Sequence, residues 1–421
     1  MTVKAIDLAN GISLASDGTR AHDAMRAAAR LRLGALIILA ACSLFGCDDG
    51  SMNNVVIVPP AWSAPVRLFA NDLRLAAGTR LHAVGFTGSA IAHRSSTDEG
   101  VSWSDPVAIA GAGQLPIYGP LAAEGSNLYV LTRAGSALRV QRSTDDGLTW
   151  SAPVALLGYA ADPVDRVQMD AEDDNLHIFV GRAGSTPNAT FKVYYWRSTD
   201  AGASFGVVAT PDASLTEPPS PGGIAVENGV VHIAYAAITD LGTLGHRARY
   251  LRSLDNGATW LPPVDVSGPG TNPQIRPRPR VLDGRVLILW EEPLDHNQSQ
   301  PYPNATKSDI RATISRDNGA TWEAPQAVTA LPTVYANHPE VAVGPDGFFH
   351  VIYRISVDQK TLTTADPMGY RNSMDYGATW GEHSIAIDDP TQETHPINVV
   401  ATSNAVHIAS ANGVYARRPL R

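Results

Sequence analysis

An eight-residue segment of the form Ser-x-Asp-x-Gly-x-x-Trp occurs six times in this chain, and it limits the possible folds more than any other feature. The copy at residues 143–150 reads Ser-Thr-Asp-Asp-Gly-Leu-Thr-Trp, and we call each copy a box. The box aspartates are spaced 47, 55, 55, 62 and 58 residues apart; they are Asp98, Asp145, Asp200, Asp255, Asp317 and Asp375. A period of about 40–60 residues is typical of a propeller or an array of similar units.

The residue types of a box are those of a tight turn between two strands. An Asp side chain accepts hydrogen bonds from backbone N–H groups two residues on, and the Gly supplies a positive φ. The Trp, which is Phe205 in one copy, starts the next strand and buries a large apolar surface. We therefore expect the six aspartates to be structural and not catalytic.

The box resembles the Asp-box, or BNR, repeat of the sialidase superfamily. The resemblance extends from about Trp62 to the C-terminus. It implies an all-β fold, a β-propeller of four-stranded blades. It also implies that each box lies between the third and fourth strands of a blade, on the face away from the functional site.

A second pattern, an alternating apolar strand, occurs seven times and sets the blade count. The copies begin at Leu81, Leu128, Leu176, Val231, Val286, Phe349 and Val406. The last copy is not followed by a box, whereas residues 62–66 repeat the Trp-Ser-Ala-Pro-Val of residues 150–154. We therefore predict seven blades, with residues 62–69 supplying the fourth strand of the blade built by residues 392–420; the alternative is six blades. Such closure removes exposed sheet edges.

The first 41 residues have the features of a secretory leader. Leu33–Ala41 is apolar, too short to span a membrane, and preceded by arginines. Leu39-Ala40-Ala41-Cys42 resembles a bacterial lipobox, which implies cleavage before Cys42 and lipidation of its thiol; Cys47 is the alternative. A start at Met25 would give a leader of normal length, so we expect Met25 to be the true start.

This reading divides the chain into a leader (1–41), a lipidated tether (42–60) and a single propeller (61–421) held at the bacterial cell envelope. The two cysteines both precede the repeats, so the propeller has no disulfide and no cysteine–zinc site. Five histidines recur at one strand position in different blades, and we expect them to be structural; they are His82, His177, His232, His350 and His407. We predict no metal and no cofactor. The net charge of −9 disfavours nucleic acid as a partner.

The expected functional face is the one opposite the boxes, because the long and variable connections lie there. The innermost strands and second strands place polar residues on this face. The expected binding-face residues are Tyr118, Arg166, Arg278, His338, Glu340 and His395. Arg276, Arg278 and Arg280 alternate along one strand, so we expect them to share a face, and arginine suits carboxylate binding.

The resemblance to sialidases implies one set of catalytic candidates. That family clamps a sugar carboxylate with three arginines, uses a Tyr–Glu nucleophile pair and has an Asp general acid. The candidates are Arg74, Arg276 and Arg354 for the clamp, Tyr353 or Tyr370 with Glu291 for the pair, and Asp165 for the acid. The family's N-terminal Arg-Ile-Pro motif is absent. We therefore favour an extracytoplasmic glycan- or protein-binding module over the alternatives, an exo-α-sialidase or another glycoside hydrolase on the same fold.

Overall fold

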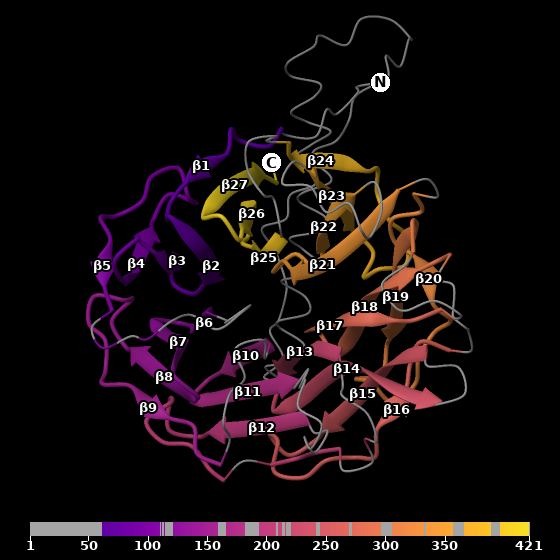
Figure 1. Ribbon diagram of the computed structural model, residues 1–421, viewed down its shortest axis with the longest axis horizontal. Helices are drawn as coiled ribbons and strands as arrows, with labels where there is room; N and C mark the ends of the chain where they lie inside the picture. The colour runs from indigo at the N-terminus through magenta and orange to yellow at the C-terminus, as the bar shows by residue number, and fades with distance from the viewer. Residues whose placement is uncertain are drawn as a thin grey trace, which may run out of the picture. The chain divides into compact units, whose positions relative to one another are not determined.

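The computed structural model describes residues 61–420, apart from gaps at 110, 112, 114–120, 159–165, 182–192, 208, 213–214, 216–219, 241–244, 269–271, 296–304, 332–333, 357–365 and 389–395. Every regular element within these residues is a β-strand. The strands form antiparallel meanders arranged in a ring (Figure 1). No helix in the described part of the chain is long and apolar enough to cross a membrane.

The strands pair into six hydrogen-bonded sheets. The first sheet contains β2 (Asn71–Ala77), β3 (Leu81–Phe86), β4 (Ile91–Ser96) and β5 (Val107–Ala108). The second contains β6 (Leu121–Glu124), β7 (Asn127–Ala134), β8 (Ala137–Ser143) and β9 (Val154–Ala155). The third contains β10 (Arg166–Glu172), β11 (Asn175–Gly181) and β12 (Val193–Ser198). The fourth contains β13 (Ser220–Glu227), β14 (Val230–Asp240), β15 (Gly245–Ser253) and β16 (Val264–Asp265).

The remaining two sheets complete the ring. The fifth contains β17 (Ile275–Leu282), β18 (Arg285–Pro293), β19 (Ser308–Ser315), β20 (Gln326–Ala327), β21 (Tyr335–Val343), β22 (Phe349–Ser356), β23 (Met368–Ser373) and β24 (Ser384–Ile387). The sixth contains β25 (Pro396–Ala401), β26 (Ala405–Ser410), β27 (Val414–Pro419) and β1 (Val66–Arg67).

The all-β propeller prediction is confirmed, but the predicted count of separate blades, seven or six, is wrong. Five of the six sheets are separate blades, and one of these has three strands plus an isolated bridge between Tyr195 and Ala209. The other sheet has eight strands, because Ser308 of β19 pairs in parallel with Tyr335 of β21. This contact joins two antiparallel meanders that the sequence pattern treats as separate units.

The predicted ring closure is confirmed. Val66 and Arg67 pair with Tyr415 and Val414, so the start of the described chain forms the outer strand of the last blade. Asn398 of β25 also exchanges hydrogen bonds with the backbone of Leu75 in β2 through both atoms of its side-chain amide. The ring is therefore closed at two places: β1 pairs with β27 on the outside, and β25 bonds to β2 on the inside.

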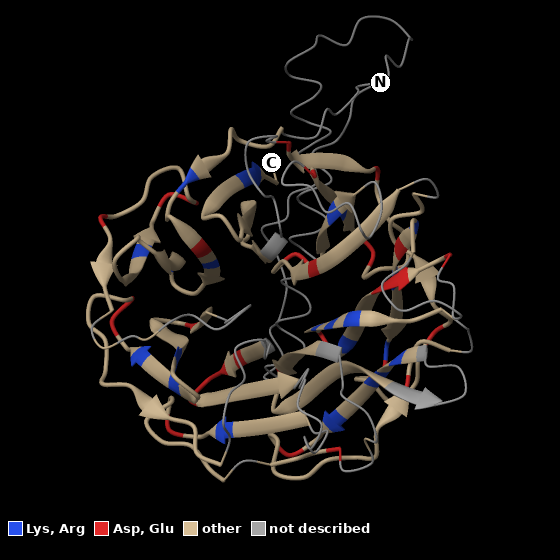
Figure 2. Ribbon diagram, viewed as in Figure 1, with Lys and Arg blue, Asp and Glu red and all other residues tan. Residues whose placement is uncertain are grey.

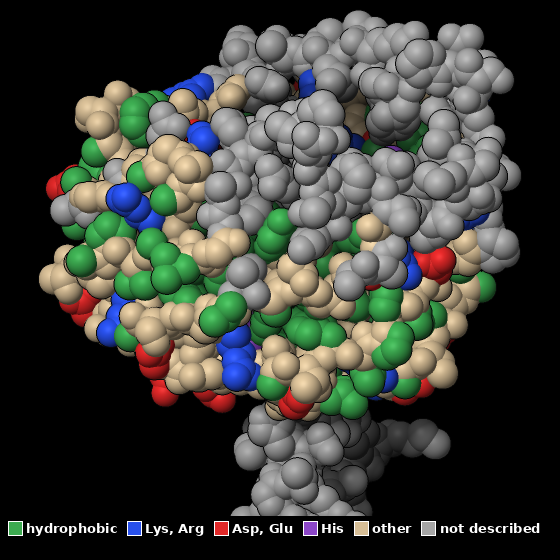
Figure 3. All heavy atoms as spheres, turned by 60° about the horizontal axis from the view of Figure 1, so that its bottom comes forward, with side chains coloured by type: hydrophobic (Ala, Val, Ile, Leu, Met, Phe, Trp, Pro, Cys, Tyr) green, Lys and Arg blue, Asp and Glu red, His purple; other side chains and the backbone are tan. Residues whose placement is uncertain are grey.

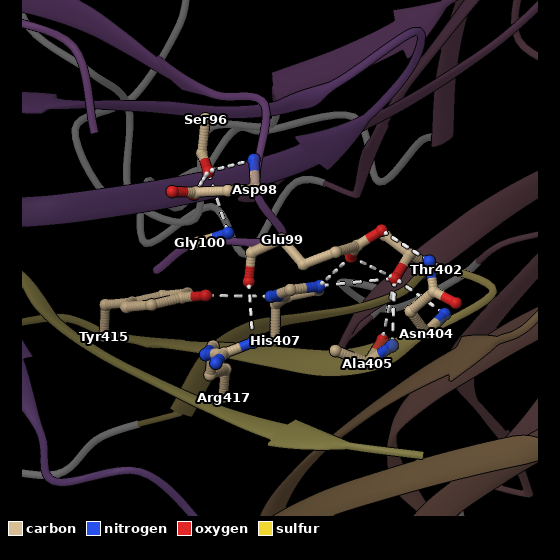
Figure 4. Close-up of polar contacts among 10 residues, drawn as sticks. All are labelled: Ser96, Asp98, Glu99, Gly100, Thr402, Asn404, Ala405, His407, Tyr415 and Arg417. Atoms are coloured by element: carbon tan, nitrogen blue, oxygen red, sulfur yellow. Dashed lines mark hydrogen bonds and ion pairs between the residues drawn. The ribbon is translucent and has the colours of Figure 1, made fainter. Parts of the chain in front are cut away.

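All six boxes form one turn between a third and a fourth strand position. In the first box, the Ser96 hydroxyl donates to Asp98 at 2.8 Å and accepts from the Gly100 N–H at 2.8 Å (Figure 4). Asp98 in turn accepts from the N–H and the hydroxyl of Ser102. These bonds lower the pKa of Asp98 to about 2. The aspartate therefore reaches four residues on, rather than the two that we predicted, and acts as a turn brace.

The residue after each box aspartate also has a positive φ of 51–58°; these residues are Glu99, Asp146, Ala201, Asn256, Asn318 and Tyr376. From the sequence we predicted a positive φ for the glycine alone. Two consecutive left-handed residues turn the chain back sharply, and only the second of them is glycine.

The box aromatic residue packs against the neighbouring blade instead of starting a strand. Trp260 lies edge-on to Tyr195 at a centroid distance of 4.9 Å, and the Tyr195 hydroxyl bonds Nδ1 of His177 at 2.6 Å. His232 with Tyr250, His350 with Tyr370 and His407 with Tyr415 repeat this hydrogen bond. All five recurrent histidines are fully buried, as a structural role requires. They hold the blade core, and the tryptophan joins one blade to the next.

Candidate functional site

Bulges at the start of the innermost strands shape the predicted functional face. The pairing register shifts between Ile275 and Arg278 in β17, and between Asn337 and Glu340 in β21. At each bulge one residue has a positive φ, 55° at Arg276 and 50° at His338. Bulges of this kind redirect side chains and gather near functional sites.

Glu291, at the end of β18, is the centre of the first polar cluster. Its carboxylate contacts Nη1 of Arg276 at 2.7 Å, accepts from the Tyr335 hydroxyl at 2.9 Å and accepts from the His338 N–H at 3.1 Å. Glu291 and Tyr335 are each about 1% exposed. The cluster therefore joins the eight-stranded sheet's two meanders through one buried carboxylate.

Arg278 and Glu340 form a second buried pair, two residues beyond Arg276 in β17 and two residues beyond His338 in β21. Nε of Arg278 donates to Glu340 at 2.9 Å, and its Nη1 donates to the Gly222 carbonyl at 3.0 Å. These bonds connect β13, β17 and β21, which are innermost strands.

Arg354 and Asp366 form a third pair, linked to the first cluster by a chain of hydrogen bonds. Arg354 contacts Asp366 at 2.9 Å, and the Ser356 hydroxyl donates to the same carboxylate oxygen at 2.8 Å. Asn337 donates to Ser356 at 3.1 Å, and its side-chain oxygen contacts Nδ1 of His338 at 2.6 Å. The structure thus brings together the predicted Arg276, Arg278, Arg354, Glu291, His338 and Glu340.

Three other candidates have separate environments. The Tyr353 hydroxyl bonds Nδ1 of His383 at 2.5 Å, and the Tyr370 hydroxyl bonds His350 at 2.8 Å. The tyrosine that contacts Glu291 is Tyr335, so the expected pairing of Glu291 with Tyr353 or Tyr370 is not the observed one. The sequence feature that could have identified Tyr335 is its position at the start of an innermost strand. Arg74 is buried, donates to the Leu73 carbonyl at 3.2 Å and lies 4.0 Å from Asp72.

Four predicted residues are not placed by the structure. Tyr118, Asp165 and His395 lie outside the described residues, and Arg166 is described only as the first backbone position of β10.

The expectation that Arg276, Arg278 and Arg280 share a face is wrong. The bulge after Ile275 breaks the two-residue alternation, so Arg276 contacts Glu291 and Arg278 contacts Glu340. Arg280 lines a central cavity of about 290 Å³, to which all seven innermost strands contribute. Basic and acidic residues both occur in strands around the ring (Figure 2). On the described surface in Figure 3, basic and acidic side chains are likewise interspersed.

The central cavity contains one acid that sequence reasoning missed. Asp170 accepts hydrogen bonds from the Val226 N–H at 2.9 Å and the Ala171 N–H at 3.0 Å. Burial raises the pKa of Asp170 to about 6, and the positive charge of Arg280 opposes this rise. Among the residues that the structure describes, no three His, Cys, Asp or Glu side chains are placed to hold a metal ion.

Comparisons with known proteins support the fold. No family model matches the chain, and no curated protein matches it. A protein of unknown function from Dyadobacter fermentans DSM 18053 is 15% identical, with a TM-score of 0.51 over 87% of this chain and 100% of that chain. A PL25 polysaccharide lyase, an ulvan lyase, is 12% identical, with a TM-score of 0.53 over 70% of this chain and 78% of that chain. At these identities the similarity is one of fold alone.

Proposed function

We propose that this protein is a glycan- or protein-binding β-propeller whose ligand contacts the Arg276–Glu291 face. The carrying observation is that three arginines on this face, Arg276, Arg278 and Arg354, each already contact a carboxylate at 2.7–2.9 Å. Arg276 is the exposed member, with 21% of its side chain accessible, and its pairing with Glu291 places donors and an acceptor side by side, which suits recognition of hydroxyl groups. A clamp for an anionic sugar needs guanidinium charge that is not already neutralised.

We infer further that the six boxes are repeats of the Asp-box type. The identical hydrogen bonds of the six boxes support kinship with the sialidase superfamily.

The alternative function is an exo-α-sialidase or another glycosidase or lyase. The observation that favours it is the Tyr335–Glu291 pair beside Arg276, since a tyrosine bonded to a carboxylate resembles an activated nucleophile. The ulvan lyase of similar fold has also been solved with a bound -[GlcA(1-4)Rha3S]- unit, at a TM-score of 0.51 and 12% identity over 70% of this chain and 78% of that chain.

The proposed location is the bacterial cell envelope, through lipid on Cys42 or, alternatively, Cys47. Its support is the lipobox pattern of residues 39–42. Metabolic labelling with a fatty acid tests this anchor: label lost in Cys42→Ser and kept in Cys47→Ser assigns it to Cys42, and the reverse assigns it to Cys47. Label kept in the double variant would contradict both.

A glycan array with the purified protein tests the binding function. Glu291→Gln should weaken binding at least tenfold, because it removes the charge that pairs with Arg276 and replaces one of the two acceptor oxygens with an N–H donor. Glu323→Gln is the matched control: Glu323 also pairs with an arginine, Arg316, but that pair is exposed beside a box. Hydrolysis of a fluorogenic sialoside that is abolished in Tyr335→Phe would instead establish the alternative. Binding that is unchanged in Glu291→Gln would refute the proposed face.

A further inference from the structure

The turns on the box face are joined in part of the ring by glutamates at the ends of innermost strands. Glu172 ends β10, and its carboxylate accepts from the N–H groups of Asn228 and Gly229 in the next unit. Glu227 ends β13 and accepts in the same way from Asp283 and Gly284. Each glutamate therefore fills the space between its strand and the following turn.

The innermost strand β6 also ends at a glutamate, Glu124, whereas the other four innermost strands end at an apolar residue. The last residues of β17, β21, β25 and β2 are Leu282, Val343, Ala401 and Ala77. All four line one cavity of about 720 Å³. Ala77, Val343 and Ala401 also line the central cavity, so the larger cavity is its mouth on the box face. Its volume is in the range of ligand pockets, about 300–1,000 Å³.

The wall of this mouth is polar and firmly held. Glu99 accepts from Thr402 at 2.6 Å, from Asn404 at 3.1 Å and contacts Nε2 of His407 at 3.2 Å (Figure 4). On the neighbouring side, Asp146 contacts Arg80 at 3.3 Å. These contacts hold both carboxylates as fixed acceptors in a rigid wall.

The lining also supplies hydroxyl groups and a guanidinium. Thr97 and Ser403 contribute hydroxyls from a box and from a strand turn, and Arg80 contributes N–H donors beyond its contact with Asp146. Two carboxylates against one guanidinium give this wall a net negative charge, which opposes an anionic ligand. The apolar strand ends provide a surface for C–H groups.

We propose that this cavity is a second ligand site, on the face opposite the Arg276–Glu291 cluster, and that it takes one neutral sugar residue. Hydroxyls, fixed carboxylates and one guanidinium of the cavity would bind the sugar hydroxyls, while Leu282 and Val343 would contact the apolar face of the sugar ring. The site is independent of the function proposed above, because it shares none of that cluster's residues.

Saturation-transfer NMR on the whole protein tests this site with the methyl glycosides of glucose, galactose, mannose and rhamnose. Ser403→Trp fills the mouth, and Asp174→Trp is the control, because Asp174 is also an exposed turn residue but does not line the cavity. We expect saturation transfer from the protein to at least one neutral glycoside, weakened at least tenfold in Ser403→Trp and unchanged in Asp174→Trp.

A second variant protects the test against misfolding. Val343→Glu installs the residue that ends β10 and β13, so it should close the cavity with a side chain that this fold already uses. Loss of transfer in Val343→Glu supports the site. Transfer to none of the four glycosides, equal transfer in Ser403→Trp and Asp174→Trp, or stronger transfer to methyl sialoside would overturn the proposal.

Discussion

The box glycines allow the contact between blades to be measured, and Gly257→Ala is the sharpest case. A Cβ atom at Gly257 would lie 1.8 Å from the Tyr195 hydroxyl oxygen. Gly284 is the matched control, since its φ of +69° is close to the +79° of Gly257 and a Cβ there meets no atom within 4 Å. Both alanines carry the cost of a left-handed residue, about 1–2 kcal/mol.

The extra cost at Gly257 comes from displacing Tyr195. The bond between Tyr195 and His177 would be lost, at about 1–3 kcal/mol for a buried polar group. The edge-on contact with Trp260 would weaken, at about 0.5–1.5 kcal/mol. Gly257→Ala should therefore lower the free energy of unfolding by about 3–6 kcal/mol, against about 1–2 kcal/mol for Gly284→Ala.

Urea denaturation followed by tryptophan fluorescence measures this difference. The m-value should stay constant in both variants, which shows that the same surface is exposed on unfolding. Equal destabilisation of the two variants would refute the idea that the box glycine is required for the tyrosine of the neighbouring blade.

Three further predictions follow from the same contacts. Burial lowers the pKa of His82, His177 and His350 from 6.5 to about 4, so these histidines are neutral in the folded protein near pH 7. The free energy of unfolding should be full above pH 6.5 and fall by roughly 3 kcal/mol per histidine as the pH drops to about 4. A urea midpoint that stays constant over this pH range would contradict the prediction. Glu99→Gln should weaken ring closure by about 1–2 kcal/mol because it loses the charge that His407, Thr402 and Asn404 contact, whereas the exposed Glu323→Gln should have little effect in the same urea assay. Trp62→Ala should cost about 2–4 kcal/mol, because Trp62 contacts Tyr370 edge-on at 5.2 Å as a box tryptophan would; a loss below about 1 kcal/mol in thermal melting would show that it is not an equivalent residue.

Local rules were enough to predict the repeating parts of this protein. The seven alternating apolar segments all became second strands, because a two-residue apolar period fits a sheet with a buried face. The Trp-Ser-Ala-Pro-Val match predicted that residues near 62–66 replace the missing outer strand, and Val66 pairs with Tyr415 as expected. These features depend on residues that are close in sequence or that copy one another.

The functional site was only partly predictable. Arg276, Glu291 and His338 were selected because they lie at strand ends on one face, and the structure does gather them. Tyr335 was missed as the partner of Glu291, because the two residues are 44 positions apart in sequence and belong to different meanders. The alternation rule also failed for Arg276, since the bulge between Ile275 and Arg278 turns its side chain toward Glu291, whereas Arg278 and Arg280 lie beyond the bulge in regular register.

By itself, the sequence determined the repeat, the strand pattern, the box turns and the closing strand. Only the tertiary structure decided which blades merge into one sheet, where each arginine points and where cavities remain. The physical reason is that a repeat sets hydrogen bonds within a unit, whereas cavities and ion pairs arise between units. In the sequence, Leu282 and Val343 are ordinary apolar strand residues. In the folded ring they occupy the strand-end position that Glu172 and Glu227 hold in other units, and the cavity lies where they replace the glutamate.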